Sequence, residues 1–248
     1  MLCTTRRTMF VTQPASPATD PMFTRILTSA LIAGSGAGLV ASLLHFLFVQ
    51  PVLLQAELFE SGALQHFAHR ATEMPVMTFA FDPVRDGLSI VFYMLIYSGY
   101  GLILVSLMSI ADDQGSRVTA RTGLLWGIAG FVTVLLAPGV SLAPEVPGVA
   151  AADVAPRQIW WFATVGATGV ALWLIAFGKD HLVVGLAALL LLAPHLYGAP
   201  EPDVLTGPAP PEIAALYAAR VFGVGLAVWA CLGVFAGALW SGDRREDL

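Results

Sequence analysis

The chain has 248 residues, of which 57% are hydrophobic and only 12% are charged, and its formal net charge is −5. Soluble domains average roughly 45–50% apolar and about 25% charged residues, so this composition excludes an ordinary soluble protein and predicts a membrane protein. No basic stripe, nucleotide-phosphate loop or dinucleotide signature occurs, which argues against nucleic acid as a partner, against an ATP motor and against a tightly bound cofactor. The two cysteines, Cys3 and Cys231, cannot supply a disulfide framework or a thiolate metal site.

Residues 1–21 differ from the rest of the chain. They are rich in Pro, Thr, Ser and Ala without a long apolar run, which predicts a disordered N-terminal extension. Arg6 and Arg7 form a pair found in twin-arginine signals, but no hydrophobic region follows them closely. Met22 directly precedes the first apolar run, so the sequence leaves open whether Met1 or Met22 is the true start.

Six apolar segments follow within a single transmembrane domain at 22–243, ahead of a short tail at 244–248. A spanning helix needs about 20 mostly apolar residues, because lipid cannot satisfy the backbone. The predicted spans cover residues 26–49, 88–110, 122–142, 159–177, 181–197 and 213–240. The fifth is short and crosses only if its two histidines lie at the membrane interfaces. The sequence therefore predicts an all-α membrane protein, a polytopic bundle of about six helices.

The distribution of Lys and Arg predicts the orientation of these spans. If the N-terminus is cytoplasmic, eight of the twelve Lys and Arg residues fall inside, three fall outside, and Arg220 lies within the last span. This bias predicts cytoplasmic N and C termini. It also requires an even number of spans, which favours keeping the short fifth one.

Small and aromatic residues indicate how the helices pack. Glycines four residues apart occur on three spans, at Gly34/Gly38, Gly123/Gly127 and Gly233/Gly237. Each pair shares one helix face and permits close backbone approach, which predicts tight packing but carries no chemistry. Trp160, Trp161 and Trp240 stand at predicted span ends, where tryptophan is typical of interfacial anchors.

Two stretches resemble each other at an offset of 50 residues. Leu142–Gly148 is followed by Asp153, and Leu192–Gly198 is followed by Asp203. The shared Pro, Gly and Asp positions favour a duplicated helical hairpin, although chance agreement is the alternative in so biased a composition. A duplication would place both loops on the outer side, as in transporters whose repeats flank one site.

The predicted outer side is acidic and rich in metal ligands. An acidic surface concentrates cations, and imidazole combined with carboxylate suits borderline divalent metals such as Co, Ni and Zn. Four candidate ligands would recruit the metal at the surface: His195, Glu145, Asp203 and Asp153. Two more, His45 and Glu57, would line the first step inward.

Each candidate also has a purely structural interpretation. His45 can simply form a hydrogen bond between helices, and His195 can sit at the membrane interface without a ligand. His66 and His69 could share a helical face and bind one ion, although two solvated loop residues are the simpler reading. Arg220 needs a counter-ion such as Asp153 or Asp203, or must extend to the interface.

Several motifs resemble the CbtA-type predicted cobalt transporter subunits. They are Met22–Arg25 before the first helix, Gln55–Glu60 after it, Leu142–Gly148 with Arg157–Trp161, and Pro194–Asp203. The first outer loop departs from the family's His-rich pattern, because only His66 and His69 remain there. The resemblance implies a multi-pass protein of a bacterial inner membrane, associated with cobalt supply for cobalamin. It also implies a small His-rich single-helix membrane subunit as a partner and no catalytic residues.

The leading hypothesis is therefore a non-enzymatic membrane subunit for uptake of a divalent metal, with cobalt as the transported cation. A divalent cation moving inward gains about 4.6 kcal/mol at 100 mV, so the membrane potential could drive uptake by itself; the sequence does not specify a coupling ion or another energy source. The alternative is a structural or assembly subunit that binds other membrane proteins, or further copies of itself, through its glycine faces. An intramembrane metalloenzyme is a third hypothesis, but no HExxH pair occurs.

Overall fold

The computed structural model describes residues 21–65 and 82–246, and within this part of the chain it contains helices and no strand. The predictions for Arg6, Arg7, His66 and His69 fall outside the described residues. The predicted all-α polytopic bundle is confirmed. By length and composition, five helices of the described part can cross a membrane, and one further apolar helix is shorter.

The first two passes are long and run in opposite directions. α1 (Pro21–Leu44), the π-helical turn η1 (His45–Val49) and α2 (Gln50–Glu60) form one continuous helix, and α3 (Pro83–Asp113) returns beside it. The helix thus extends well beyond the predicted first span. Glu57 and Glu60, which follow the predicted first span, therefore lie on α2 of this same helix.

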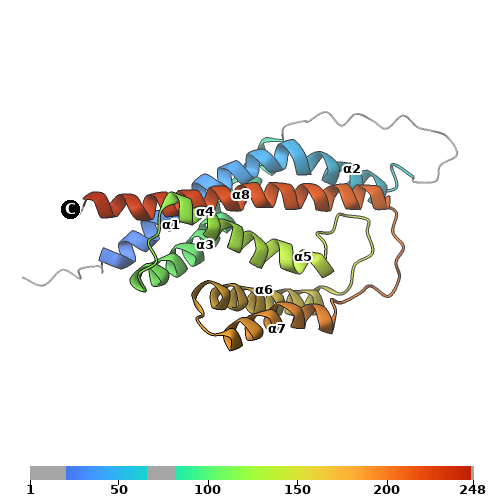
Figure 1. The fold of residues 1–248 in the computed structure, drawn as a ribbon. Coiled ribbons are helices and arrows are strands. Elements are labelled where there is room, and N and C mark those ends of the chain that lie inside the picture. Colours follow the sequence, from blue (N-terminus) through green and yellow to red (C-terminus); the bar gives the residue numbers. More distant parts are fainter. Residues whose placement is uncertain (1–20, 66–81, 247–248) are drawn as a thin grey trace, which may run out of the picture.

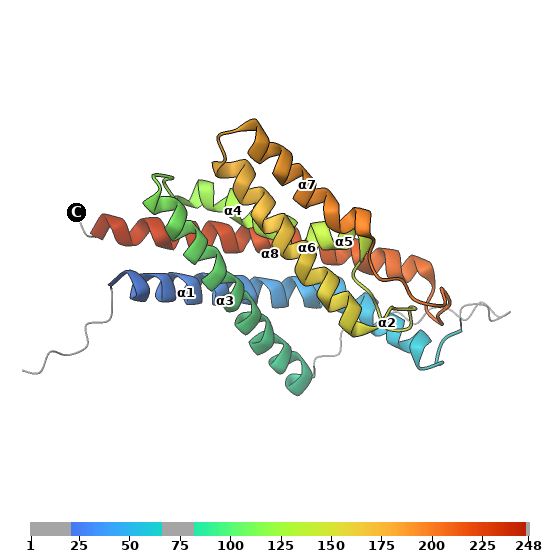
Figure 2. The same cartoon turned by 90° about the horizontal axis from the view of Figure 1, so that it is seen from below.

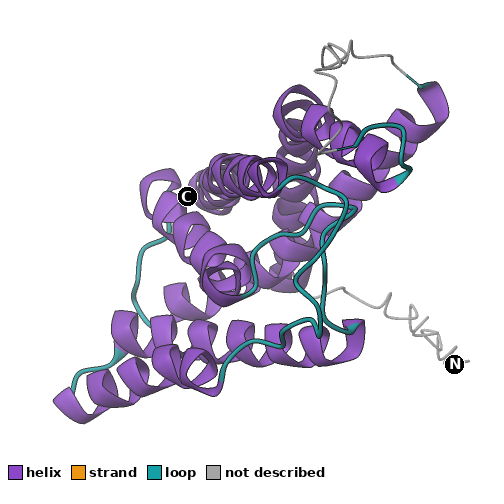
Figure 3. Ribbon diagram, turned by 90° about the vertical axis from the view of Figure 1, so that its right-hand side faces the viewer, coloured by secondary structure: helices purple, strands orange, loops and turns teal. Residues whose placement is uncertain are grey.

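The remaining passes follow in order. α4 (Ala120–Phe131), the π-turn η2 (Val132–Leu136) and α5 (Ala137–Ser141) form the third, and the helices α6 (Val154–Phe177), α7 (His181–Tyr197) and α8 (Pro211–Glu246) follow; of these, α7 is the shorter apolar helix. The start of α1 and the end of α8 lie at the same end of the molecule (Figure 1). The loops 142–153 and 198–210 lie at the opposite end, which faces the viewer in Figure 3. We call this second end the loop end.

The helices pack in two groups. α1 packs against α3 and α8, and α4 packs against α8, whereas α6 packs mainly against α7. The α6–α7 pair lies to one side of the other helices (Figures 1 and 2) and contacts them chiefly through η2 and α5. A second small buried cluster at the loop end joins α2, the 142–153 loop and the start of α8 through Val52, Ala56, Phe59, Val146 and Ile213.

The predicted duplicated hairpin is wrong as a structural unit. Its second copy would require α7 to pack on α8, but no substantial packing joins these helices. Glycines explain why: a Cβ atom on Gly127 would collide with the Trp229 carbonyl oxygen, and one on Gly233 would collide with the Gly123 carbonyl oxygen. α8 is therefore committed to α4. The likeness survives only locally, since Gly148 and Gly198 both adopt positive φ angles, of 80° and 92°.

Tryptophan packing also differs from the sequence interpretation for two residues. Trp240 is only 2% exposed; Arg25 lies 4.1 Å over its ring and its indole Nε1 donates to Asp112 Oδ2 at 3.1 Å. Trp160 is buried too, and its Nε1 donates to the Pro194 carbonyl at 3.2 Å. Both rings tie helices together, so they are not lipid-facing anchors. The indole N–H explains this, because it can hold a neighbouring helix as readily as a lipid headgroup.

Candidate functional site

Polar side chains connect the first helix to α3 at three levels. We call these contacts the polar ladder: Ser35 Oγ to Ser98 Oγ at 3.3 Å, His45 Nδ1 to Tyr93 OH at 2.8 Å, and Gln50 Nε2 to Asp86 Oδ1 at 3.3 Å. Polar groups within a membrane protein are costly unless they find partners on neighbouring helices. The ladder supplies such partners over residues 35–50 of the first helix and 86–98 of α3.

The π-turn at His45–Val49 follows from Pro51. A proline ring inside an α-helix clashes with the carbonyl four residues earlier, and the proline nitrogen has no hydrogen to donate. Widening the turn relieves this clash, and π-turns of this kind are frequent at functional sites. The second π-turn obeys the same rule, because Pro138 stands two residues after the end of Val132–Leu136.

The widened turn sets the register of the ladder. In a regular α-helix, residues five apart point about 140° away from each other. The extra residue accommodated by the π-turn reduces this angle, so that His45 and Gln50 both reach α3. On α3, Asp86 and Tyr93 are seven residues apart, which places them on one face. Tyr93 therefore contacts His45 on the first helix, and Asp86 contacts Gln50.

Arg220 of α8 contacts the same turn. Its guanidinium Nη1 donates to the Phe48 carbonyl oxygen at 2.7 Å. The predicted counter-ion, Asp153 or Asp203, is not its partner in the structure. A carbonyl in a turn widened by proline is a good acceptor, because the regular ladder of helical hydrogen bonds is interrupted there. α8 is thereby attached to the point at which the first helix deviates.

The contact of the polar ladder nearest the loop end, which we call its first rung, is built around a buried carboxylate. The predicted second span begins at residue 88 and leaves Asp86 in the preceding loop, but Asp86 is 0% exposed within the first turns of α3. Its Oδ1 accepts from Arg85 Nε at 2.9 Å as well as from Gln50, and its Oδ2 accepts from the Asp82 backbone N–H at 2.9 Å. Asp82 in turn caps α3 by accepting the N–H of Val84 and Arg85. Reciprocal capping thus draws Asp86 inward.

The predicted surface ligands lie elsewhere at the loop end. Glu145 forms an ion pair with Arg157, and burial raises the pKa of Glu145 by more than the positive charge of Arg157 lowers it. His195 Nδ1 is 2.8 Å from Ser141 Oγ, and its ring meets that of Trp160 edge-on with centroids 6.0 Å apart.

The other predicted ligands are more exposed or more separated. Asp153 and Asp203 are exposed on their loops, Glu57 is exposed on α2, and His45 lies on the polar ladder. Among the described residues, no group of three or more His, Cys, Asp or Glu side chains could hold a metal ion. The structure therefore brings the six candidates into separate contacts rather than into one coordination sphere.

Of the six ladder residues, sequence reasoning singled out only His45. It missed Ser35, Ser98, Tyr93 and Gln50, and it left Asp86 outside the predicted second span. Tyr93 lies in an apolar run and looks like an ordinary membrane aromatic. Gln50 did carry a signal, because an amide directly before a proline within an apolar helix marks a distorted turn.

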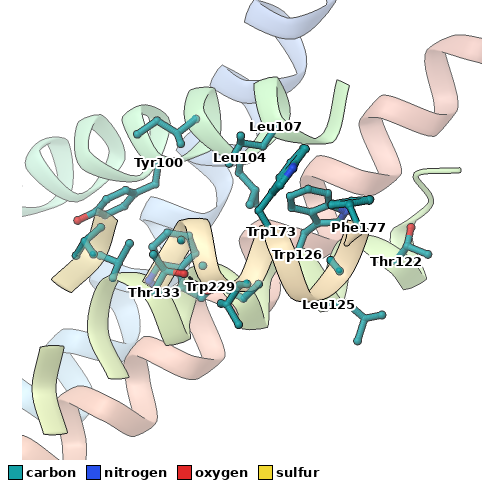
Figure 4. A pocket seen from close by; sticks show the side chains of 18 of the residues that line it. Tyr100, Leu104, Leu107, Thr122, Leu125, Trp126, Thr133, Trp173, Phe177 and Trp229 are labelled. Atoms are coloured by element: carbon teal, nitrogen blue, oxygen red, sulfur yellow. Dashed lines mark hydrogen bonds between the residues drawn. The ribbon is translucent and has the colours of Figure 1, made fainter. Parts of the chain in front are cut away.

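A well-formed cavity lies away from the polar ladder and is lined by other residues. It has a volume of about 570 Å³ and lies between α3, α4 and α6. Aromatic rings of Trp126, Trp173 and Phe177 form one part of its wall, and Tyr100 and Trp229 another (Figure 4). Because hydrocarbon and aromatic groups dominate this lining, the cavity offers few ligands to a hydrated cation.

A family model described as probable cobalt transporter subunit (CbtA) matches residues 23–241. Comparisons with the curated proteins and with the solved structures found no match. The family match covers the chain from the first turn of α1 into the last turns of α8. It therefore includes the polar ladder and the whole of the loop end.

Proposed function

The chain belongs to the CbtA family of probable cobalt transporter subunits, and from this premise we propose that it carries cobalt or a related divalent cation into the cell. The proposed setting is a bacterial inner membrane, with both termini in the cytoplasm and the loop end outside. The excess of Lys and Arg at the end that holds the termini supports this orientation.

One observation carries the transport proposal: an imidazole is held inside the membrane by a hydroxyl on the next helix. When His45 Nδ1–H donates to the Tyr93 oxygen, Nε2 keeps its lone pair. Metal-binding histidines commonly donate their second N–H in this way, which fixes the tautomer and the orientation of the ring. His45 is therefore the proposed ligand of the inward step.

The acidic loop end is the proposed point of entry. Asp153, Asp203 and Glu57 are exposed there and would raise the local concentration of cations. Glu145 and His195 would accept the metal by exchanging their present partners, Arg157 and Ser141. Since no ATP-binding signature occurs in the sequence, the membrane potential or a partner protein would supply the driving force.

Partners follow from membership in a subunit family. Lipid surrounds the apolar helices, and a small His-rich single-helix subunit is the proposed protein partner; a second copy of this chain is the other. A structural or assembly role is the alternative function. The separation of the six predicted ligands favours this alternative, because a subunit without a transport site needs no coordination sphere.

The first test is cobalt accumulation in transporter-deficient cells that express the chain alone or with a candidate partner. Transport predicts uptake that is lost in the Glu145→Ala/His195→Ala double variant and in His45→Phe. A Tyr197→Phe variant is the matched control, because this side chain is exposed at the end of α7. Normal expression and complex formation without uptake in any combination would support the assembly role instead.

A further inference from the structure

We propose that Asp86 and Gln50 form an oxygen-ligand site for the transported divalent cation, and that Arg85 holds the place of the cation until it arrives. This inference rests on the proposed function and assigns it a site that the surface ligands do not provide. Three features of the loop end support it: a buried carboxylate, an exchangeable guanidinium and an unpartnered amide oxygen.

The first feature is the complete burial of Asp86. A carboxylate without solvent contact is stable only if a positive charge or several hydrogen-bond donors compensate it. The compensating charge comes from the neighbouring residue, since Arg85 Nε lies 2.9 Å from Asp86 Oδ1. A site that already compensates one positive charge at this oxygen can compensate another.

The second feature is the contrast in exposure between these two side chains. The Arg85 side chain is 44% exposed, whereas that of Asp86 is 1% exposed. Because much of the arginine side chain already has access to water, we infer that its guanidinium can exchange the carboxylate for water by rotating about the side-chain bonds. The backbone of α3 need not move, and Asp86 stays fixed by the Asp82 N–H and the Gln50 amide.

The third feature is the amide of Gln50, a residue that is only 5% exposed. Its Nε2 donates to Asp86 Oδ1, while its Oε1 is buried without a hydrogen-bond partner in the structure. A buried carbonyl oxygen without a donor carries a desolvation cost that a bound cation would relieve. The amide that contacts the carboxylate through its nitrogen thus carries an oxygen that is available as a ligand.

Charge at the loop end matches a divalent ion. Asp82 and Glu57 also lie within electrostatic reach of Arg85, so among the described residues three carboxylates act on this one guanidinium, an excess of two negative charges. Asp82 is already engaged as the cap of α3, and Glu57 is exposed. They would attract the ion, while Asp86 and Gln50 would bind it together with water molecules.

The position of the Asp86–Gln50 site suits an early step in the inward movement of the cation. Gln50–Asp86 is the rung of the polar ladder nearest the loop end, and His45–Tyr93 is the next rung. A cation released from oxygen ligands at the first rung would meet the His45 imidazole at the second. Borderline metals such as cobalt accept both kinds of ligand, whereas calcium and magnesium prefer oxygen alone.

The test measures Co²⁺ binding to the purified full chain in phospholipid nanodiscs by calorimetry. We expect Asp86→Asn to weaken binding by at least about tenfold, as loss of a ligand or its direct support does. Arg85→Gln should tighten binding severalfold, because the competing guanidinium is gone. Asp82→Asn is the matched control and should change the affinity less than Asp86→Asn. Unchanged affinity in both Asp86→Asn and Arg85→Gln would overturn the proposal.

A second pair of variants covers the case in which Asp86→Asn fails to fold, as judged by its melting transition. Gln50→Glu adds a carboxylate and should raise the affinity for Co²⁺, whereas Gln50→Leu should lower it; equal affinities would reject the site. Binding is measured without transport, so it decides this inference even if no cell accumulates cobalt. Conversely, wild-type uptake that survives in Asp86→Asn with normal kinetics would reject the site and leave the proposed transport intact.

Discussion

The two helix groups cross the same membrane but differ in where they keep ionisable side chains. Among α1, α3 and α8, the groups His45, Asp86 and Arg220 lie on the spans and contact polar partners on neighbouring helices. In the described α6–α7 pair, ionisable residues such as Arg157 and His195 stand near the helix ends. The comparison indicates that ionisable groups occur within the membrane where helices pack tightly and where one of them, the first helix, is distorted by a π-turn.

Close approach is what makes the difference possible. A Cβ atom on Gly34 or Gly38 would collide with, or press tightly against, the backbone of α3, so these helices nearly touch. At that separation short polar side chains can bridge the interface, as Ser35 and Ser98 do. In α6, by contrast, a Cβ atom on Gly166 would meet nothing within 4 Å.

We expect the largest effect from a substitution that disturbs the close packing of the first group at a glycine. Gly127→Ala would drive a methyl group into the Trp229 carbonyl, and we expect a loss of about 2–3 kcal/mol of stability from overpacking. Gly166→Ala is the matched control and should be neutral or slightly stabilising, because alanine favours the helix. Thermal melting in detergent measures both. Equal melting temperatures for the two variants would show that the α4–α8 interface can accommodate the added methyl group, contrary to this prediction.

The next effect concerns the link between α8 and the π-turn. Arg220→Lys keeps the positive charge but loses the planar guanidinium that donates to Phe48, which should cost about 1–2 kcal/mol. Arg121→Lys on the exposed surface of α4 should cost nothing measurable. The two melting curves in the same detergent compare them. A smaller loss for Arg220 than for Arg121 would contradict the role of the carbonyl contact.

A smaller effect tests the middle rung of the ladder. Tyr93→Phe removes the hydroxyl that holds His45, and hydrogen bonds between membrane helices average about 0.6 kcal/mol. Cobalt uptake should fall further than this stability loss explains, because the imidazole loses its fixed orientation. Tyr197→Phe on α7 should leave melting and uptake unchanged. If both variants transport equally well, the orientation of His45 is irrelevant to uptake.

Sequence reasoning found the helices and their closest contacts because these depend on local patterns. The length of each apolar run predicts a span, and Gly123/Gly127 with Gly233/Gly237 predicts close packing, which the structure confirms between α4 and α8. The partner of each face is not local information. Leu192–Gly198 at the end of α7 resembles Leu142–Gly148, which predicted that α7 pairs with α8. Instead α7 packs on α6, because the glycine face of α8 is already occupied by α4.

The candidate site was harder to predict for a related reason. His45 was identified because a polar ring within an apolar run is costly wherever it lies. Asp86 was assigned to a loop because its burial depends on Asp82, Arg85 and Gln50 together, and Gln50 reaches it only through the register set by the π-turn. A pattern along one helix cannot specify a register that two helices determine jointly.

The smallest predicted effect lies on the side of α6, where an ion pair is partly solvated. Burial raises the pKa of Glu145 above its ordinary value of 4.5, so the folded protein binds this proton more tightly than the unfolded chain does. Stability should therefore increase slightly as the pH falls through the interval between the ordinary and the raised pKa. Glu145→Gln removes this titration, and the melting temperature of the wild type should rise relative to that of the variant across the interval. A relative fall would mean that attraction to Arg157 outweighs desolvation, and the ionised pair would then stabilise the 142–153 loop.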